Sequence, residues 1–237
     1  MRKPPHHLGT ALLSGPKRDV VKAMVAFLAA LVTFSGASSV PFETQSIDAL
    51  RNAKKVLRKG DFGRGLATLD SLLFRDGVSV ALEAPNDLDA SVERGLEVWN
   101  EQLGEKTFHF VPAGESADVR VKFVRSLDAE GADVQGMVEA SRELSWSDRD
   151  RSYKLRATIF VRDNIDGRPL RADETVSVVA HEVGHLLGLA DVSSRDRLMG
   201  PLVIGYPHAG PTRDESAAVR SFRSSIRDSY PKRVDKR

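Results

Sequence analysis

Apolar residues recur along the chain with two periods, and the period predicts the elements. Helical spacing occupies residues 46–76 as two short stretches, separated by a polar, glycine-containing break at 59–63. Strict alternation then predicts strands at 78–82, 108–110, 119–123 and 155–161. Helical spacing returns at 87–103, 172–187 and 212–226. Helices and strands in this order predict a mixed α+β fold.

The two helical stretches at 46–76 predict a helical hairpin with a faint likeness to a single tetratricopeptide unit. One such unit cannot bury its own apolar face, and no second copy follows, so the hairpin should pack on the neighbouring domain. Two interpretations of residues 38–76 stay open. We favour a plain N-terminal extension over an inhibitory propeptide, and the N-terminus of the secreted form would separate them.

The first 39 residues differ in composition from the rest of the chain. Five basic residues precede an apolar run of about a dozen residues at 23–34, which is followed by small residues at 35–39. This order predicts an export signal over residues 1–37, cleaved after about Ala37, and hence a secreted or extracytoplasmic protein without stable membrane association. The run is short for a membrane span, although a retained N-terminal anchor is the alternative.

Composition narrows the function classes. The 237 residues are 41% apolar and 29% charged, which fits one soluble core with a small appendage. A net charge of +2 is too balanced to indicate nucleic-acid binding, and no basic patch with interleaved aromatic residues is visible. The chain has no cysteine. Disulfides, thiolate zinc ligands and a cysteine that blocks the metal of a proenzyme are therefore excluded.

The helix predicted at 172–187 carries the candidate chemistry, and Asp173 is expected to cap its start. His181 and His185 lie four residues apart, so both imidazoles share one helix face and can bind one metal ion. Glu182 lies beside them, where a carboxylate can take a proton from a metal-bound water without ligating the metal. Gly188 ends the helix and can turn the chain, so that Asp191 approaches the metal from another direction. Three protein ligands with one open position are typical of catalytic zinc.

These residues also carry a family resemblance. The stretch His181-Glu182-Val183-Gly184-His185-Leu186-Leu187-Gly188-Leu189-Ala190-Asp191 resembles the extended zinc signature of metzincin metallopeptidases, and Arg197-Leu198-Met199-Gly200-Pro201 resembles their Met-turn. The spacing is most similar to that of matrixins, and the likeness covers roughly residues 76–230. Matrixins have histidine where this chain has Asp191, whereas the snapalysin-like metzincins have aspartate there.

The resemblance implies a metzincin-like catalytic domain at 77–230, with a twisted, mostly parallel sheet, an active-site helix and a Met-turn, preceded by the hairpin. It implies one catalytic zinc ion held by His181, His185 and Asp191, with Glu182 as general base. Met199 would form an apolar floor. A pocket wall would come from Pro201, Leu202 and Tyr206, and a short edge strand beside the cleft from residues 136–140. The expected function is that of a secreted, monomeric zinc endopeptidase acting on peptide or protein substrates.

Other possibilities remain at this point. In matrixins the region that corresponds to residues 126–151 holds a structural zinc and calcium. Here it contains no histidine, so we expect no second zinc. Calcium binding through Asp128, Glu130, Asp133 and Asp148 stays open, but no regular spacing supports it. In a thermolysin-like alternative Glu215 would be the third ligand, which leaves Gly188 and Met199 without a role. A non-catalytic, zinc-containing binding module is the non-enzyme alternative. Thr212 and Glu215 predict a capping box, and residues 231–237 a disordered basic tail.

Overall fold

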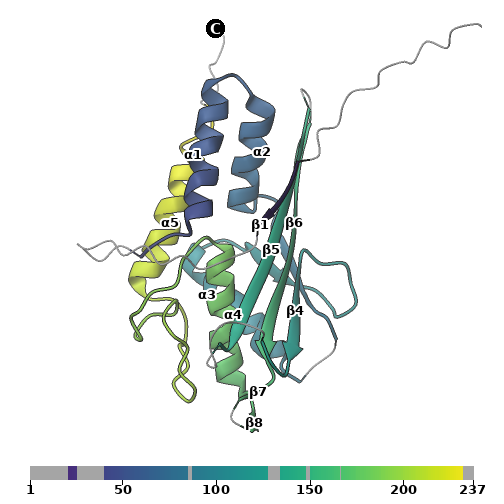
Figure 1. Ribbon diagram of the computed structural model, residues 1–237, viewed down its shortest axis with the longest axis vertical. Coiled ribbons are helices and arrows are strands. Elements are labelled where there is room, and N and C mark those ends of the chain that lie inside the picture. Colours follow the sequence, from purple (N-terminus) through teal and green to yellow (C-terminus); the bar gives the residue numbers. More distant parts are fainter. Residues whose placement is uncertain are drawn as a thin grey trace, which may run out of the picture.

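The computed structural model describes residues 40–84, 87–127, 134–147, 150–165 and 167–231, together with the backbone of residues 21–25. Its elements in chain order are β1 (Val21–Val25), α1 (Thr44–Arg58), α2 (Phe62–Leu73), β2 (Val78–Leu82), α3 (Asp89–Leu103), β3 (Phe108–Phe110), β4 (Val119–Val124), β5 (Gly136–Trp146), β6 (Arg151–Arg162), β7 (Asn164–Ile165), β8 (Arg168–Pro169), α4 (Ala172–Leu186) and α5 (Arg213–Arg227). The helices lie on one side of the main sheet (Figure 1).

The main sheet has the strand order β1-β5-β6-β4-β2-β3. Strands β3, β2, β4 and β6 run parallel to one another, whereas β5 is antiparallel to β6 and β1 is antiparallel to β5. The four strands expected from alternation are confirmed. The strand expected at 136–140 is longer than predicted, because β5 pairs with β6 over its full length, from Gly136 opposite Val161 to Trp146 opposite Arg151.

The larger core lies between the sheet and helices α3 and α4. Trp99 of α3 is fully buried, and its Nε1 donates a hydrogen bond to the carbonyl oxygen of Ala180 in α4 at 2.7 Å. Gly95 lets the two helices approach closely, since a Cβ there would lie 2.8 Å from Val179. Helix α4 is therefore packed against α3 along its length, which makes it a rigid base for the side chains it presents to the cleft.

Helices α1 and α2 form the predicted hairpin, and it packs on its neighbours as expected. A second cluster of buried apolar residues joins it to α5, made of Leu50, Ala53, Leu69, Leu72, Leu73 and Ile226. Asp70 of α2 accepts hydrogen bonds from Nε of Arg151 in β6 at 2.6 Å and from the hydroxyl of Tyr230 at 2.7 Å. Apolar burial and a half-buried ion pair thus hold the hairpin to both the sheet and the C-terminal helix.

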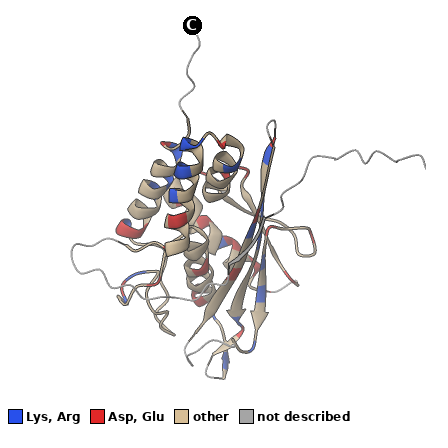
Figure 2. Cartoon of the chain, turned by 45° about the horizontal axis from the view of Figure 1, so that its top comes forward, with Lys and Arg blue, Asp and Glu red and all other residues tan. Residues whose placement is uncertain are grey.

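Several predictions fall wholly or partly outside the described residues. These are the greater part of the export signal, the calcium candidates Asp128, Glu130, Asp133 and Asp148, and residues 232–237 of the tail. Of the predicted signal, residues 21–25 form the outermost strand of the sheet. No helix among the described residues is both long and apolar enough to cross a bilayer. Positions of both charge signs are interspersed over helices and strands (Figure 2).

Candidate metal centre

Helix α4 begins at Ala172, but the capping residue predicted for it is wrong. Asp173 is the second residue inside the helix, where its carboxylate accepts from the backbone N of Glu174 at 3.0 Å. The backbone N–H of Arg171, at the start of the helix, has no acceptor within the helix backbone. It donates instead to the carboxylate of Glu174 at 3.0 Å. Acidic side chains in the first turn also interact favourably with the helix dipole.

The turn after α4 brings Asp191 back over the helix. Gly188 has a φ of +95°, and the backbone N of Leu189 donates to the carbonyl of Gly184 at 3.0 Å. A residue with a Cβ is strained in this left-handed conformation, so glycine is the residue that permits the reversal. The predicted role of Gly188 is confirmed.

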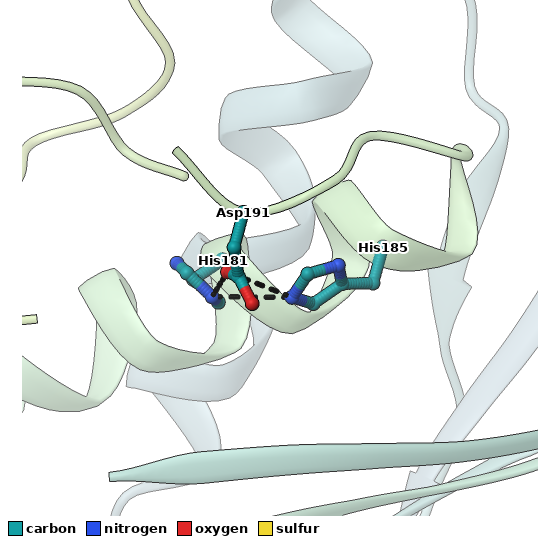
Figure 3. Close-up of side chains that lie close together, drawn as sticks. All are labelled: His181, His185 and Asp191. Carbon is teal, nitrogen blue, oxygen red and sulfur yellow. Dashed lines mark hydrogen bonds and ion pairs between the residues drawn. The ribbon is translucent and has the colours of Figure 1, made fainter. Parts of the chain in front are cut away.

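His181, His185 and Asp191 converge on one point, as Figure 3 shows. The two Nε2 atoms lie 3.2 Å apart, and Oδ1 of Asp191 lies 3.2 Å from Nε2 of His181 and 3.4 Å from Nε2 of His185. A tetrahedral zinc ion with ligand distances of about 2.0–2.1 Å requires ligand atoms about 3.3–3.4 Å apart. The three atoms therefore have the spacing of three corners of such a tetrahedron, and the donor set is one that zinc accepts.

Backbone carbonyls set the orientation of both rings. Nδ1 of His181 lies 2.7 Å from the carbonyl oxygen of Leu198, and Nδ1 of His185 lies 2.9 Å from that of Leu189. A carbonyl oxygen only accepts, so each Nδ1 donates a hydrogen to it, and Nε2 is the nitrogen of each ring that faces the shared point. Two ring nitrogens and a carboxylate oxygen converge there, and a metal cation that replaces the protons on the two Nε2 atoms would be stabilised by all three.

Burial and the close approach of these groups shift the pKa values of Asp191, His185 and Glu182. Burial alone would raise the pKa of Asp191, but hydrogen bonds from His181 and His185 hold it well below its usual range. Burial opposes the charged form of His185, yet the carboxylates of Asp191 and Glu43 raise its pKa well above the ordinary value. Burial raises the pKa of Glu182, which is 3% exposed. A raised pKa suits a carboxylate that accepts and returns protons.

The convergent residues form the floor of an open cleft of about 790 Å³. One side of the cleft is formed by the start of β5, Gly136, Met137 and Val138. Glu182 faces this strand so closely that a Cβ at position 136 would lie 2.6 Å from its Oε1. The chain after the Met-turn also lines the cleft, through Pro201, Leu202, Val203 and Ile204.

Met199 is fully buried below α4 and packs its Sδ against Gly184, between the two histidines. The carboxylate of Glu215 accepts from the backbone N of Met199 at 2.8 Å and of Leu198 at 3.3 Å. It also accepts from the backbone N and the hydroxyl of Thr212, each at 2.7 Å, which forms the predicted capping box. The alternative that makes Glu215 the third metal ligand is wrong, because both of its oxygens are occupied in supporting the Met-turn.

The predicted pocket wall divides into two parts. Pro201 and Leu202 line the cleft, whereas Tyr206 does not line it and is 77% exposed. Tyr206 follows Gly205, whose backbone N donates to the carboxylate of Glu174 at 2.9 Å. This hydrogen bond holds the segment after Pro201 to the first turn of α4, and the Tyr206 side chain that follows is not part of the cleft lining.

Glu174 therefore joins the wall to the active-site helix, and we expect its charge to stabilise the fold. Two hydrogen bonds from Arg168, at 2.6 and 2.8 Å, lower the pKa of Glu174 to about 2 against the opposing effect of burial, and the backbone N–H groups of Arg171 and Gly205 add to them. Glu174→Gln should lower the free energy of unfolding at neutral pH by about 2 kcal/mol, measured by urea titration.

Protonation of Glu174 should also make the free energy of unfolding fall at acid pH. Its folded-state pKa lies below the ordinary value of 4.5, so its contribution is complete above that value and is lost as the pH falls toward 2. Unfolding free energies of the wild type should therefore converge on those of Glu174→Gln over this interval. A constant difference between the two proteins down to pH 2 would contradict this assignment.

Two features of the site lay outside the sequence prediction. Glu43, just before α1, lines the cleft beside His185, and residues 134 and 135 extend the β5 side. No motif marks these positions, because their place depends on how distant segments pack.

Comparisons with known proteins agree with this geometry. The profile described as Matrixin matches residues 79–222, which is more than half of the chain. A hatching enzyme of Paracentrotus lividus is 28% identical over 141 residues, which cover 59% of this chain and 23% of that protein. The chain thus spans about a quarter of the length of that relative. The predicted metzincin-like α+β fold and the matrixin resemblance are confirmed. The chain belongs to the matrixin family of metalloproteases.

Proposed function

We propose that this protein is a secreted zinc endopeptidase whose metal is held by His181, His185 and Asp191. The observation that carries the proposal is the convergence of three ligand atoms within 3.4 Å of one another, next to the buried carboxylate of Glu182 and open to a cleft. A structural zinc site has four protein ligands, whereas this arrangement offers three and leaves a corner facing the cleft.

In this proposal the residues of the chain hold the zinc ion, orient the peptide and transfer the proton. Zinc, when bound, would supply Lewis-acid chemistry that activates water and polarises the peptide carbonyl. Glu182 takes one proton from the attacking water as the water oxygen bonds to the carbonyl carbon. It returns that proton to the amine nitrogen as the carbon–nitrogen bond breaks. The burial of Glu182 raises its pKa and so makes the carboxylate a stronger base toward the water proton.

The cleft favours an extended peptide. Strand β1 pairs with β5 only from Ala140 to Leu144, so within the described residues no strand pairs with the outer edge of β5 between Gly136 and Glu139. This edge borders the cleft and can accept a substrate backbone by strand addition. Pro201 and Leu202, which also line the cleft, favour an apolar side chain after the scissile bond. We expect a monomer, a single zinc ion, and export through the signal at residues 1–37.

The test is hydrolysis of casein by purified protein, with metal content measured alongside. We expect one zinc ion per chain, cleavage that stops with a chelator, and recovery when zinc is restored. One bound zinc without cleavage of any protein or peptide substrate would favour the non-catalytic binding module. Cleavage that is unaffected by complete metal removal would contradict both proposals.

A further inference from the structure

The chain just before α1 is paired with the turn that carries Asp191. We call residues 40–43 the strap. The backbone N of Glu43 donates to the carbonyl of Gly188 at 2.8 Å, and the backbone N of Ala190 donates to the carbonyl of Pro41 at 3.1 Å. Between these two hydrogen bonds, Phe42 forms an antiparallel bridge with Leu189. The strap therefore pairs with residues 188–190, the three residues that directly precede Asp191.

Side chains fix the strap on both sides of this pairing. Val40 is buried in the main core, and the ring of Phe42 stacks on that of Phe222 in α5 with centroids 4.6 Å apart. Ser46, in the first turn of α1, approaches so closely that a Cβ at Gly188 would lie 2.8 Å from its Oγ. Gly188 is thus required by the neighbouring strap and helix as well as by its positive φ.

The strap also contributes to the cleft itself without filling it. Oε1 of Glu43 lies 3.6 Å from Nδ1 of His185, on the side of the ring away from the convergence point. The cleft keeps its volume of about 790 Å³ with the strap in place. An inhibitory segment would have to cover the convergence point or the edge of β5, and the described part of residues 38–76 covers neither.

We propose that the strap and its hairpin are a permanent part of the active centre and that the strap positions Asp191 as the third metal ligand. This inference rests on the proposed function, since it assigns a role in holding the metal. Asp191 is on a loop and its side chain is 51% exposed, so apart from its contacts with the two histidines the position of its carboxylate depends on its backbone. Holding that backbone in place reduces the conformational entropy lost when the carboxylate binds a cation.

A pair of substitutions at one position isolates the strap contact. Glu43 has a φ of −52°, which proline can adopt, and the extended conformation of Phe42 suits a residue that precedes proline. Glu43→Pro removes the hydrogen bond to Gly188 together with the carboxylate, whereas Glu43→Ala removes only the carboxylate. In the full chain, competition with a chromogenic chelator should give a zinc dissociation constant about five- to tenfold higher for Glu43→Pro than for Glu43→Ala.

A third variant separates positioning from loss of stability. Leu69→Ala removes buried apolar volume from α2 and leaves the residues of the strap unchanged, so it should lower the melting temperature and keep zinc affinity at the wild-type level. Equal zinc affinities for Glu43→Pro and Glu43→Ala would overturn the inference, as would an equally weakened Leu69→Ala. The proposed function fails differently, because its failure appears in the wild type as absent zinc binding or absent cleavage.

Discussion

Replacing Glu182 with glutamine should lower kcat for peptide hydrolysis by about 100- to 10 000-fold, the range of general acid–base catalysis by one side chain. Glutamine keeps the size of glutamate but cannot take a proton from water. Glu182 is not one of the three convergent groups, so bound zinc should stay at the wild-type level. The measurement is kcat on a quenched-fluorescence peptide, with the zinc content of the same sample.

Glu139→Gln is the matched control. Glu139 lies on β5 close to the cleft, but its side chain is exposed and does not line it. The same chemical change there should leave kcat within about twofold of the wild type. A Glu182→Gln protein that retained both its zinc and its full kcat would remove Glu182 from the mechanism and leave the binding-module interpretation.

Replacing Asp191 with alanine should weaken zinc binding by at least about 100-fold. Loss of a group that only orients a ligand costs 10- to 100-fold, and loss of the ligand itself should cost more. Two histidines on one helix would remain, which is an incomplete site. Hydrolysis should disappear at zinc concentrations that saturate the wild type. Zinc affinity is measured by chelator competition and activity in the same buffer.

Asp196→Ala provides the control on the same loop. Asp196 is exposed and interacts with the hydroxyl of Ser194, away from the two histidines. Its replacement should leave zinc affinity and activity unchanged. If both alanine variants kept wild-type affinity, the third ligand would have to be another group.

Local patterns were sufficient to predict most of the fold and the centre of the site. Helical and alternating periods located the hairpin, four strands and α4, because burial of one face is a property that neighbouring residues encode together. The convergence of His181, His185 and Asp191 followed from helix periodicity and one glycine turn, all within 11 residues. These features depend on short-range geometry, which a sequence motif can carry.

Features that depend on packing between distant segments could not be predicted. The length of β5 is set by its pairing with β6. At the start of α4 the carboxylate that accepts the free backbone N–H belongs to Glu174, which is also held by Arg168 and the backbone of Gly205. Tyr206 does not line the cleft, and the residue before it, Gly205, is held at α4. The strap pairs residues 41–43 with 188–190, a contact between segments nearly 150 positions apart in the sequence. No local pattern records such a contact.

We propose that one zinc ion is bound by two histidines and Asp191. Anomalous diffraction at the zinc absorption edge, from crystals of the zinc-loaded protein, tests it most directly. We expect one peak, about 2.0–2.1 Å from Nε2 of His181 and of His185 and about 2.0–2.2 Å from an oxygen of Asp191. A peak bound by the two histidines and a different acidic residue, with the Asp191 carboxylate turned away, would contradict it.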